Sequence, residues 1–164
     1  MSLIDRAFQA NNGFARDFVP PLTKVPTPKL AVVTCMDCRL SRLDQLLGVE
    51  SLNVQVIRNA GAIATEDVIR SLVISIRAIG TDEILIMGHT RCGLDGLREE
   101  EFVAKLADET GTANGLTIGF LPFTVVDKNI RDQVEVVRSH PWIPKHVPVK
   151  GAVYDVDSGR LREV

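Results

Sequence analysis

Three side chains that bind metal ions well stand at the ends of two apolar segments of the sequence. Cys35 ends the apolar, β-branched run that begins at Leu30, and His89 and Cys92 follow a second apolar run that begins at Glu83. Thiolate sulfur and imidazole nitrogen are common zinc ligands, and three protein ligands with an open fourth position are typical of a catalytic zinc site. The spacing differs from that of a zinc finger, in which close pairs of ligands brace a small loop-built unit.

Each of these residues alone has a simpler explanation, because a buried cysteine often behaves as a small hydrophobic residue. Their joint placement favours a metal site. Apolar runs of this kind are typical of buried parallel strands, and ligands of open α/β sheets bind beyond the carboxyl ends of the strands. We therefore predict that Cys35, His89 and Cys92 lie together and bind a metal ion.

Asp37 and Arg39 follow the first ligand at intervals of two residues. If the extended chain continues, Cys35, Asp37 and Arg39 share a face. A guanidinium group can bind a carboxylate bidentately, so pairing would keep Asp37 ionised and away from the metal. The open position could then hold water, whose pKa zinc lowers towards about 7. An unpaired Asp37 could instead become the fourth ligand, and an ordinary surface ion pair is the third interpretation.

Strands and helices alternate in the segments that must position these residues. The strand at 30–35, the helix at 41–47 with Ser41 as N-cap, the strand at 53–58, the helix at 65–79 and the strand at 83–88 predict right-handed crossovers and a parallel sheet. The remaining predicted elements are a helix at 97–109, a loop at 110–122, a helix at 123–139, a strand at 150–156 and a hairpin return at 161–164.

The first 29 residues are predicted to form an arm and a connector within a single domain of residues 1–164. Residues 2–18 have the pattern of an amphipathic helix, and the Pro-rich residues 19–29 predict an extended connector. An apolar helix face at a terminus packs either on its own domain or on a partner subunit, and the residues alone favour neither.

Composition excludes several functional classes. The 164 residues are 45% hydrophobic and 24% charged, with a net charge of −2, so we expect no binding to nucleic acid or to an anionic membrane. The sequence begins without the features of a signal peptide and holds no apolar run long enough to span a membrane. The odd cysteine count argues against a disulfide framework, and we expect a cytoplasmic protein with free thiols.

Three motifs resemble, in order and spacing, the signatures of β-class carbonic anhydrases. They are Cys35-Met-Asp-Cys-Arg39, Arg58-Asn-Ala-Gly61 and His89-Thr-Arg-Cys-Gly93. The resemblance covers about residues 28–163 and is to the short branch of that family. It implies a Rossmann-like α/β fold in which helices flank a central, mainly parallel sheet. It also implies one zinc ion per subunit, held by Cys35, His89 and Cys92, and an obligate homodimer that could pair further, with the N-terminal helical arm on the partner.

The resemblance further implies reversible hydration of CO₂ to bicarbonate, by attack of zinc-bound hydroxide. The Asp37–Arg39 pair would control the open position. The small residues of the Asn59-Ala60-Gly61 loop would let the backbone approach the substrate.

Three further residues near the motifs have expected roles. Gly93 is expected to open a helix whose free N–H groups hold a bicarbonate oxygen. Cys38 stands where relatives usually have a small residue, and we expect a packing thiol that points away from Cys35. Arg58 could pair with a carboxylate near the site or cap its strand, and we expect a structural role.

Other functions fit the same residues. Relatives that hydrolyse CS₂ or COS share the scaffold and the ligands, so motifs do not separate them from carbonic anhydrases. A non-catalytic zinc-binding dimer is a second alternative, although the Asp37–Arg39 pair argues against it. A thiol redox protein using Cys35 and Cys38 fits less well, because alternation turns these two residues to opposite faces.

Overall fold

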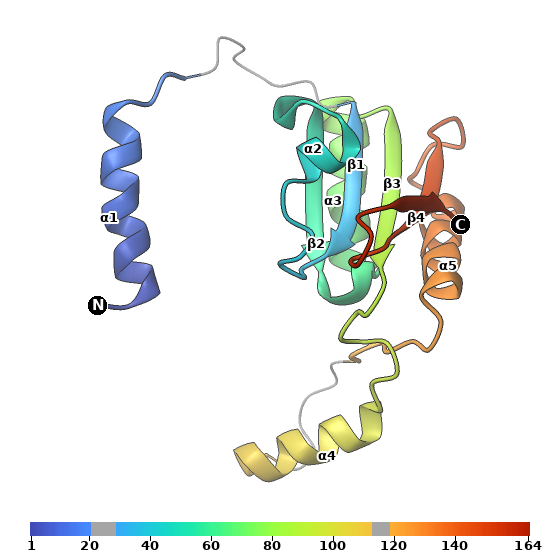
Figure 1. The fold of residues 1–164 in the computed structure, drawn as a ribbon. Coiled ribbons are helices and arrows are strands. Elements are labelled where there is room, and N and C mark those ends of the chain that lie inside the picture. The colour runs from blue at the N-terminus through green and yellow to red at the C-terminus, as the bar shows by residue number, and fades with distance from the viewer. Residues whose placement is uncertain (21–28, 113–118) are drawn as a thin grey trace.

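The strands form one five-stranded sheet with the order β2-β1-β3-β4-β5. The computed structural model of the protein describes residues 1–20, 29–112 and 119–164. Strands β1, β2, β3 and β4 run parallel to one another, and β5 is antiparallel to β4. They are β1 (Leu30–Cys35), β2 (Val54–Asn59), β3 (Glu83–His89), β4 (Val149–Tyr154) and β5 (Leu161–Glu163). The predicted α/β class, with a mainly parallel central sheet flanked by helices, is confirmed (Figure 1).

The helices lie close to the predicted ranges; all begin at other residues than predicted, whereas the predicted ends at 47, 79 and 139 are confirmed. They are α1 (Leu3–Arg16), α2 (Leu43–Leu47), α3 (Glu66–Ile74) with its π-helical extension η3 (Ser75–Ile79), α4 (Glu99–Thr110), α5 (Val126–Ser139), and the 3₁₀ turns η1 (Ser51–Asn53) and η2 (Ala60–Ala62). Ser41 does not cap α2, because Arg42 precedes the helix in the left-handed conformation, with φ 57°. None of these described helices is both long and apolar enough to cross a membrane.

Two apolar clusters hold the sheet to its helices, one on each face. Alternate residues of β1 go to opposite clusters, as the period of two in a strand requires. Ala31 and Val33 pack with the apolar stripes of α3 and α5. Val32 and Met87 pack with Leu43 of the short helix α2. The first face is therefore covered by two helices, whereas the second is covered by one short helix and loop residues.

Helix α5 approaches the sheet so closely that only glycine fits beneath it. A Cβ atom on Gly88 of β3 would lie 2.8 Å from Ile130, and one on Gly151 of β4 would also lie 2.8 Å from Ile130. Both distances are shorter than any ordinary carbon–carbon contact. These two glycines therefore fix how deeply the helix packs, which in turn sets the position of the end of β3.

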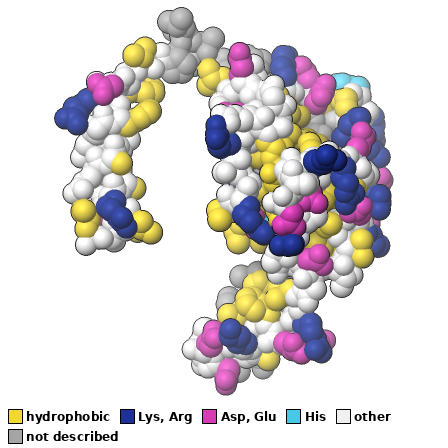
Figure 2. Space-filling model, in the orientation of Figure 1, with side chains coloured by type: hydrophobic (Ala, Val, Ile, Leu, Met, Phe, Trp, Pro, Cys, Tyr) yellow, Lys and Arg dark blue, Asp and Glu magenta, His cyan; other side chains and the backbone are white. Residues whose placement is uncertain are grey.

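Helix α1 begins with a capping box and buries none of its residues. The Asp5 amide donates to Ser2 Oγ over 3.1 Å, and the Ser2 amide donates to Asp5 Oδ2 over 2.8 Å. The large apolar side chains of this arm are exposed, namely Leu3, Ile4, Phe8, Phe14 and Phe18. Figure 1 shows α1 standing apart from the sheet, and Figure 2 shows hydrophobic side chains along it. Most of the predicted connector at 19–29 and part of the predicted loop at 110–122 lie outside the described residues.

Gly88→Ala tests the close approach of α5. The added methyl group must displace Ile130, and overpacking of this kind costs about 1–3 kcal/mol of unfolding free energy. Urea unfolding followed by circular dichroism measures the change. Gly93→Ala is the control, because the Cβ it adds meets no heavy atom within 4 Å. An unchanged urea midpoint for Gly88→Ala would contradict this description of the packing.

Candidate metal centre

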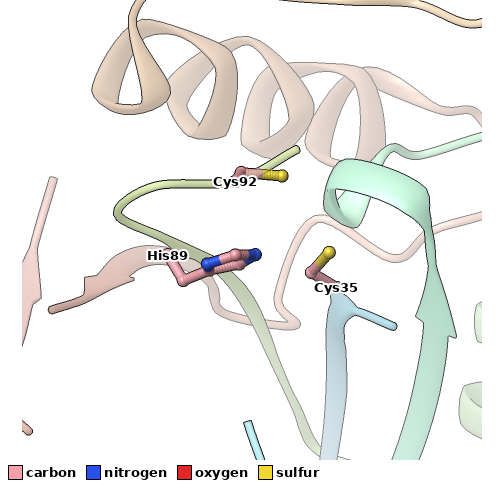
Figure 3. Close-up of side chains that lie close together, drawn as sticks. All are labelled: Cys35, His89 and Cys92. Atoms are coloured by element: carbon pink, nitrogen blue, oxygen red, sulfur yellow. The ribbon is translucent and has the colours of Figure 1, made fainter. Parts of the chain in front are cut away.

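Two adjacent parallel strands and the turn after the second bring the three predicted ligands together (Figure 3). Cys35 ends β1, His89 ends β3, and Cys92 lies in the following turn. All three are buried, and their ligand atoms lie within 4.8 Å of one another. The chain leaves β1 for β2 on one side and returns to β3 on the other, and such a reversal of strand order opens a crevice at the carboxyl ends. The predicted cluster is confirmed as a group that could hold a metal ion.

The imidazole of His89 is oriented with one nitrogen into the cluster. Its Nδ1 atom lies 2.8 Å from the carbonyl oxygen of Thr90, which favours a proton on Nδ1 and a lone pair on Nε2. Nε2 is buried and finds no hydrogen-bond partner among the described residues. A buried polar atom without a partner costs about 1–3 kcal/mol, and a cation bound at Nε2 would remove that cost.

The thiols of Cys35 and Cys92 shift each other's pKa in opposite directions. The Cys92 thiol donates to Cys35, and this hydrogen bond outweighs burial and lowers the pKa of Cys35. The same bond, with burial, raises the pKa of Cys92. Burial opposes the charged form of His89, but the neighbouring Cys35 thiolate and the Thr90 carbonyl raise the pKa of its imidazole overall. A metal that binds both sulfurs displaces the remaining thiol proton.

Asp37 stands beside the cluster and is paired with Arg39. Its Oδ1 atom accepts from Arg39 Nε over 2.9 Å, and its Oδ2 atom accepts from Nη2 over 2.7 Å. The guanidinium holds the pKa of the carboxyl far below its usual range. Asp37 Oδ2 nevertheless lies only 3.9 Å from His89 Nε2. The carboxylate is therefore ionised, turned to Arg39 and still close to the atoms that would hold a metal.

The geometry of this pair comes from a turn and not from continued strand alternation. Strand β1 ends at Cys35. The backbone amide of Arg39 then donates to Asp37 Oδ1 over 2.9 Å, and the amide of Leu40 donates to the Asp37 carbonyl over 3.1 Å. Such a turn, in which an Asp side chain bonds the backbone two residues on, is favoured by Asp itself. Arg39 also donates to the carbonyl of Arg91 over 2.9 Å, which joins the two ligand-bearing loops.

The Asn59–Gly61 segment contacts Cys35 and the residue that follows it. The side-chain oxygen of Asn59 accepts from the Ile63 amide over 3.0 Å, and its side-chain nitrogen donates to the Ile63 carbonyl over 2.7 Å. Gly61 adopts φ 79° and directs its N–H at Cys35 Sγ over 3.5 Å. Ala60 is exposed between them. The contact of these residues with substrate stays a prediction, whereas their contact with the ligand loop is a feature of the structure.

Two expectations near the site are wrong. Gly93 opens no helix, because the chain turns there, with the Asp95 amide bonded to the Cys92 carbonyl over 3.0 Å, and the next helix begins at Glu99. Cys38 is not a packing thiol, since it is exposed. The prediction assumed strand alternation beyond Cys35, where the strand has already ended. Cys38 is not part of the metal-capable group, and Cys35 and Cys38 are both free thiols.

Sequence reasoning missed a buried amide that supports the site. Asn129 of α5 is buried and donates to the Gly61 carbonyl over 3.3 Å. It also accepts from Gln133 over 3.1 Å, whose own oxygen accepts from the Ala64 amide over 2.9 Å. The available signal was an Asn next to Ile130 in the apolar stripe of the helix. A buried polar side chain in such a stripe indicates a specific partner.

Known proteins resemble the chain over its whole length. The profile of the carbonic anhydrase family matches residues 30–161. β-Carbonic anhydrase 1 of Mycobacterium tuberculosis is 37% identical over 164 residues, which cover 100% of this chain and 99% of that protein. The crystal structure of a carbonic anhydrase from Streptococcus mutans is 38% identical, with a TM-score of 0.89, and the match covers 100% of this chain and 98% of that one. A carbon disulfide hydrolase of Acidithiobacillus thiooxidans is 35% identical over 152 residues, which cover 82% of this chain and 76% of the hydrolase. The chain belongs to the β-class carbonic anhydrase family.

Proposed function

We propose that the protein binds one zinc ion per subunit and catalyses the reversible hydration of CO₂ to bicarbonate. The ligands are Cys35, His89 and Cys92. The observation that supports this most directly is the buried Nε2 atom of His89, which has no partner among the described residues and lies beside two sulfurs. Bound zinc supplies a Lewis acid that lowers the pKa of water towards about 7.

Asp37 and Arg39 act on the water that reacts. Asp37 is ionised, so it accepts a hydrogen bond from that water and turns one of the water's lone pairs towards CO₂. Arg39 occupies both carboxylate oxygens and so keeps Asp37 out of the ligand set. The proton released in the reaction leaves to buffer. Asp37 contacts the reacting water and Arg39 acts through its bonds to Asp37, and the proposal assigns both to the catalytic machinery.

The walls near the ligands are built from small residues. We assign substrate contact to Asn59, Ala60, Gly61 and Gly93, through their backbone groups. CO₂ is small, linear and apolar, so it needs close approach and few polar contacts. Gly61 must also be small because of its neighbour Leu94, since a Cβ atom at position 61 would lie 2.8 Å from Leu94 Cδ1.

A second candidate activity is hydrolysis of CS₂ or COS. The similarity to a carbon disulfide hydrolase is the observation that favours it. Both substrates are linear and match CO₂ in their valence electrons, so the same ligands and the same Asp37–Arg39 pair could serve them. Stopped-flow hydration of CO₂, with COS and CS₂ hydrolysis measured on the same preparation, separates the two activities.

We propose a homodimer in the cytoplasm. The exposed apolar face of α1 finds no cover within the described chain, and the second face of the sheet carries one short helix. A second copy of the chain would cover both. A reducing compartment keeps Cys35 and Cys92 as thiols that can bind metal.

Cys35→Ser and Cys38→Ser test the ligand assignment. Cys35→Ser removes a ligand, so we expect the zinc content to fall from one per chain to near zero and hydration of CO₂ to stop. Cys38→Ser is the matched control, since Cys38 is exposed and outside the cluster, and should keep zinc and activity. Atomic absorption measures the zinc. Loss of zinc from Cys38→Ser would show that the assignment is wrong.

Asp37→Ala tests the catalytic pair. The variant should keep its zinc, because Asp37 is not a ligand, but lose about 100-fold in kcat/KM for CO₂, the range expected for a positioned proton acceptor. Asp132→Ala is the control, because this exposed carboxylate on α5 pairs only with Lys128 among the described residues. A zinc-loaded wild-type protein inert towards CO₂, COS and CS₂ between about pH 6 and pH 9 would refute the enzymatic proposal.

Phe8→Asp tests the dimer. A charge in the apolar face of α1 should weaken association about tenfold or more if this helix covers the partner, as expected for a central apolar anchor. Gln9→Asp introduces the same charge on the opposite side of the helix and should leave association unchanged. Sedimentation velocity across a concentration series measures both variants. Equal sedimentation of Phe8→Asp and wild type would remove α1 from the interface.

A further inference from the structure

The guanidinium of Arg58 is bonded to three carbonyls of the turn that follows β1. Its Nε donates to the Cys35 carbonyl over 2.9 Å, and its Nη2 donates to the carbonyls of Asp37 over 3.1 Å and Leu40 over 2.7 Å. In the described chain, Arg58 forms no ion pair with a carboxylate. Its donors are therefore used on backbone oxygens of one short segment, residues 35–40.

This segment needs such a partner because it has left the sheet. The last backbone hydrogen bond between β1 and β2 runs from the Met36 amide to the Asn59 carbonyl over 2.9 Å. Beyond it the carbonyls have no strand to face, and backbone groups without partners are costly. Arg58 lies one residue before Asn59 on β2, opposite Thr34. From there its side chain continues the bonding pattern past the end of the strand.

The three carbonyls flank the residues that the site depends on. One belongs to the ligand Cys35, one to Asp37, and the third to Leu40, which follows Arg39. Asp37 Oδ2 lies 2.7 Å from Arg39 Nη2 and 3.9 Å from His89 Nε2. The backbone position of residues 35–40 therefore sets whether the carboxylate lies closer to Arg39 or to the cluster.

We propose that Arg58 is a positioning residue for the Asp37–Arg39 pair, acting through the backbone of residues 35–40. Its effect on rate rests on the proposed function, whereas its effect on the turn does not. Arginine suits this role because its planar group presents five donors in a fixed fork. Lysine presents donors from a single point on a flexible stem and cannot span three carbonyls in the same way.

Variants at Arg58 should fold, because its side chain is exposed and is not part of either apolar cluster. Arg58→Gln and Arg58→Lys are the test variants. Arg77→Gln is the matched control, because Arg77 is also exposed and donates through Nε and Nη2 to a backbone carbonyl, that of Trp142, over 3.3 Å and 3.2 Å. All three should keep one zinc per chain and a cooperative thermal transition.

Amide hydrogen exchange measures the stability of this turn independently of any enzymatic activity. The amides of Met36, Arg39 and Leu40 are all hydrogen-bonded in this segment. We expect them to exchange about tenfold faster in Arg58→Gln than in wild type, with Arg58→Lys closer to Arg58→Gln and Arg77→Gln unchanged. Unchanged exchange in Arg58→Gln would overturn the proposal.

A double-mutant cycle shows whether Arg58 acts through Asp37. Arg58→Gln should lower kcat/KM for CO₂ about 10- to 100-fold in the wild-type background, the cost of a misplaced catalytic group. It should cost less than about threefold in the Asp37→Ala background, because the group it positions is gone. Equal losses in both backgrounds would overturn the proposal. A wild type without CO₂ hydration would refute the proposed function instead, and exchange alone would then decide the role of Arg58.

Discussion

The structure depends on the burial of three side chains that could bind a metal ion, one of which has a polar atom without a hydrogen-bond partner among the described residues. Two sulfurs and an imidazole nitrogen lie within 4.8 Å in the interior, and the nitrogen has no hydrogen-bond partner within the described chain. Burial of unpaired polar groups opposes folding. A protein core would replace such a cluster with apolar side chains if the cluster did no more than pack. The cluster is therefore a group that could hold a metal ion, and the fold buries it at some cost to its own stability.

The sheet supports the cluster by placing rigid elements beneath it. Cys35 and His89 end adjacent strands, and the register of those strands fixes how far apart the two side chains stand. The depth of α5 is set by two glycines under Ile130, and the same helix holds Gly61 through Asn129. Gly61 in turn donates to the Cys35 sulfur. The positions of Cys35 and His89 are thus determined by the packing of the core, whereas Cys92 is placed by the turn after β3.

The sequence identified the clustered residues and the Asp37–Arg39 pair, but it mispredicted the backbone of the turns that follow the strands. Apolar runs identified the ends of β1 and β3, so Cys35, His89 and Cys92 were assigned correctly to one cluster. Expectations for Cys38 and Gly93 failed three and four residues beyond the ends of those strands. There the chain follows conformations that side-chain type does not signal, such as the left-handed Arg91, with φ 55°. Arginine rarely adopts this conformation, so no pattern rule would have placed a turn at that residue.

The choice between CO₂ and CS₂ does not follow from the ligands, because both classes of relative match this chain at similar identity, 37% and 35%. The share of each relative's length that the match covers separates the two classes of relative better. The match spans 99% of the mycobacterial carbonic anhydrase but 76% of the hydrolase, so about a quarter of the hydrolase has no counterpart in the matched region. Segments outside the shared scaffold are where access to an identical metal centre can differ, since the ligand geometry is fixed by the core. Full-length similarity therefore favours CO₂ as the substrate.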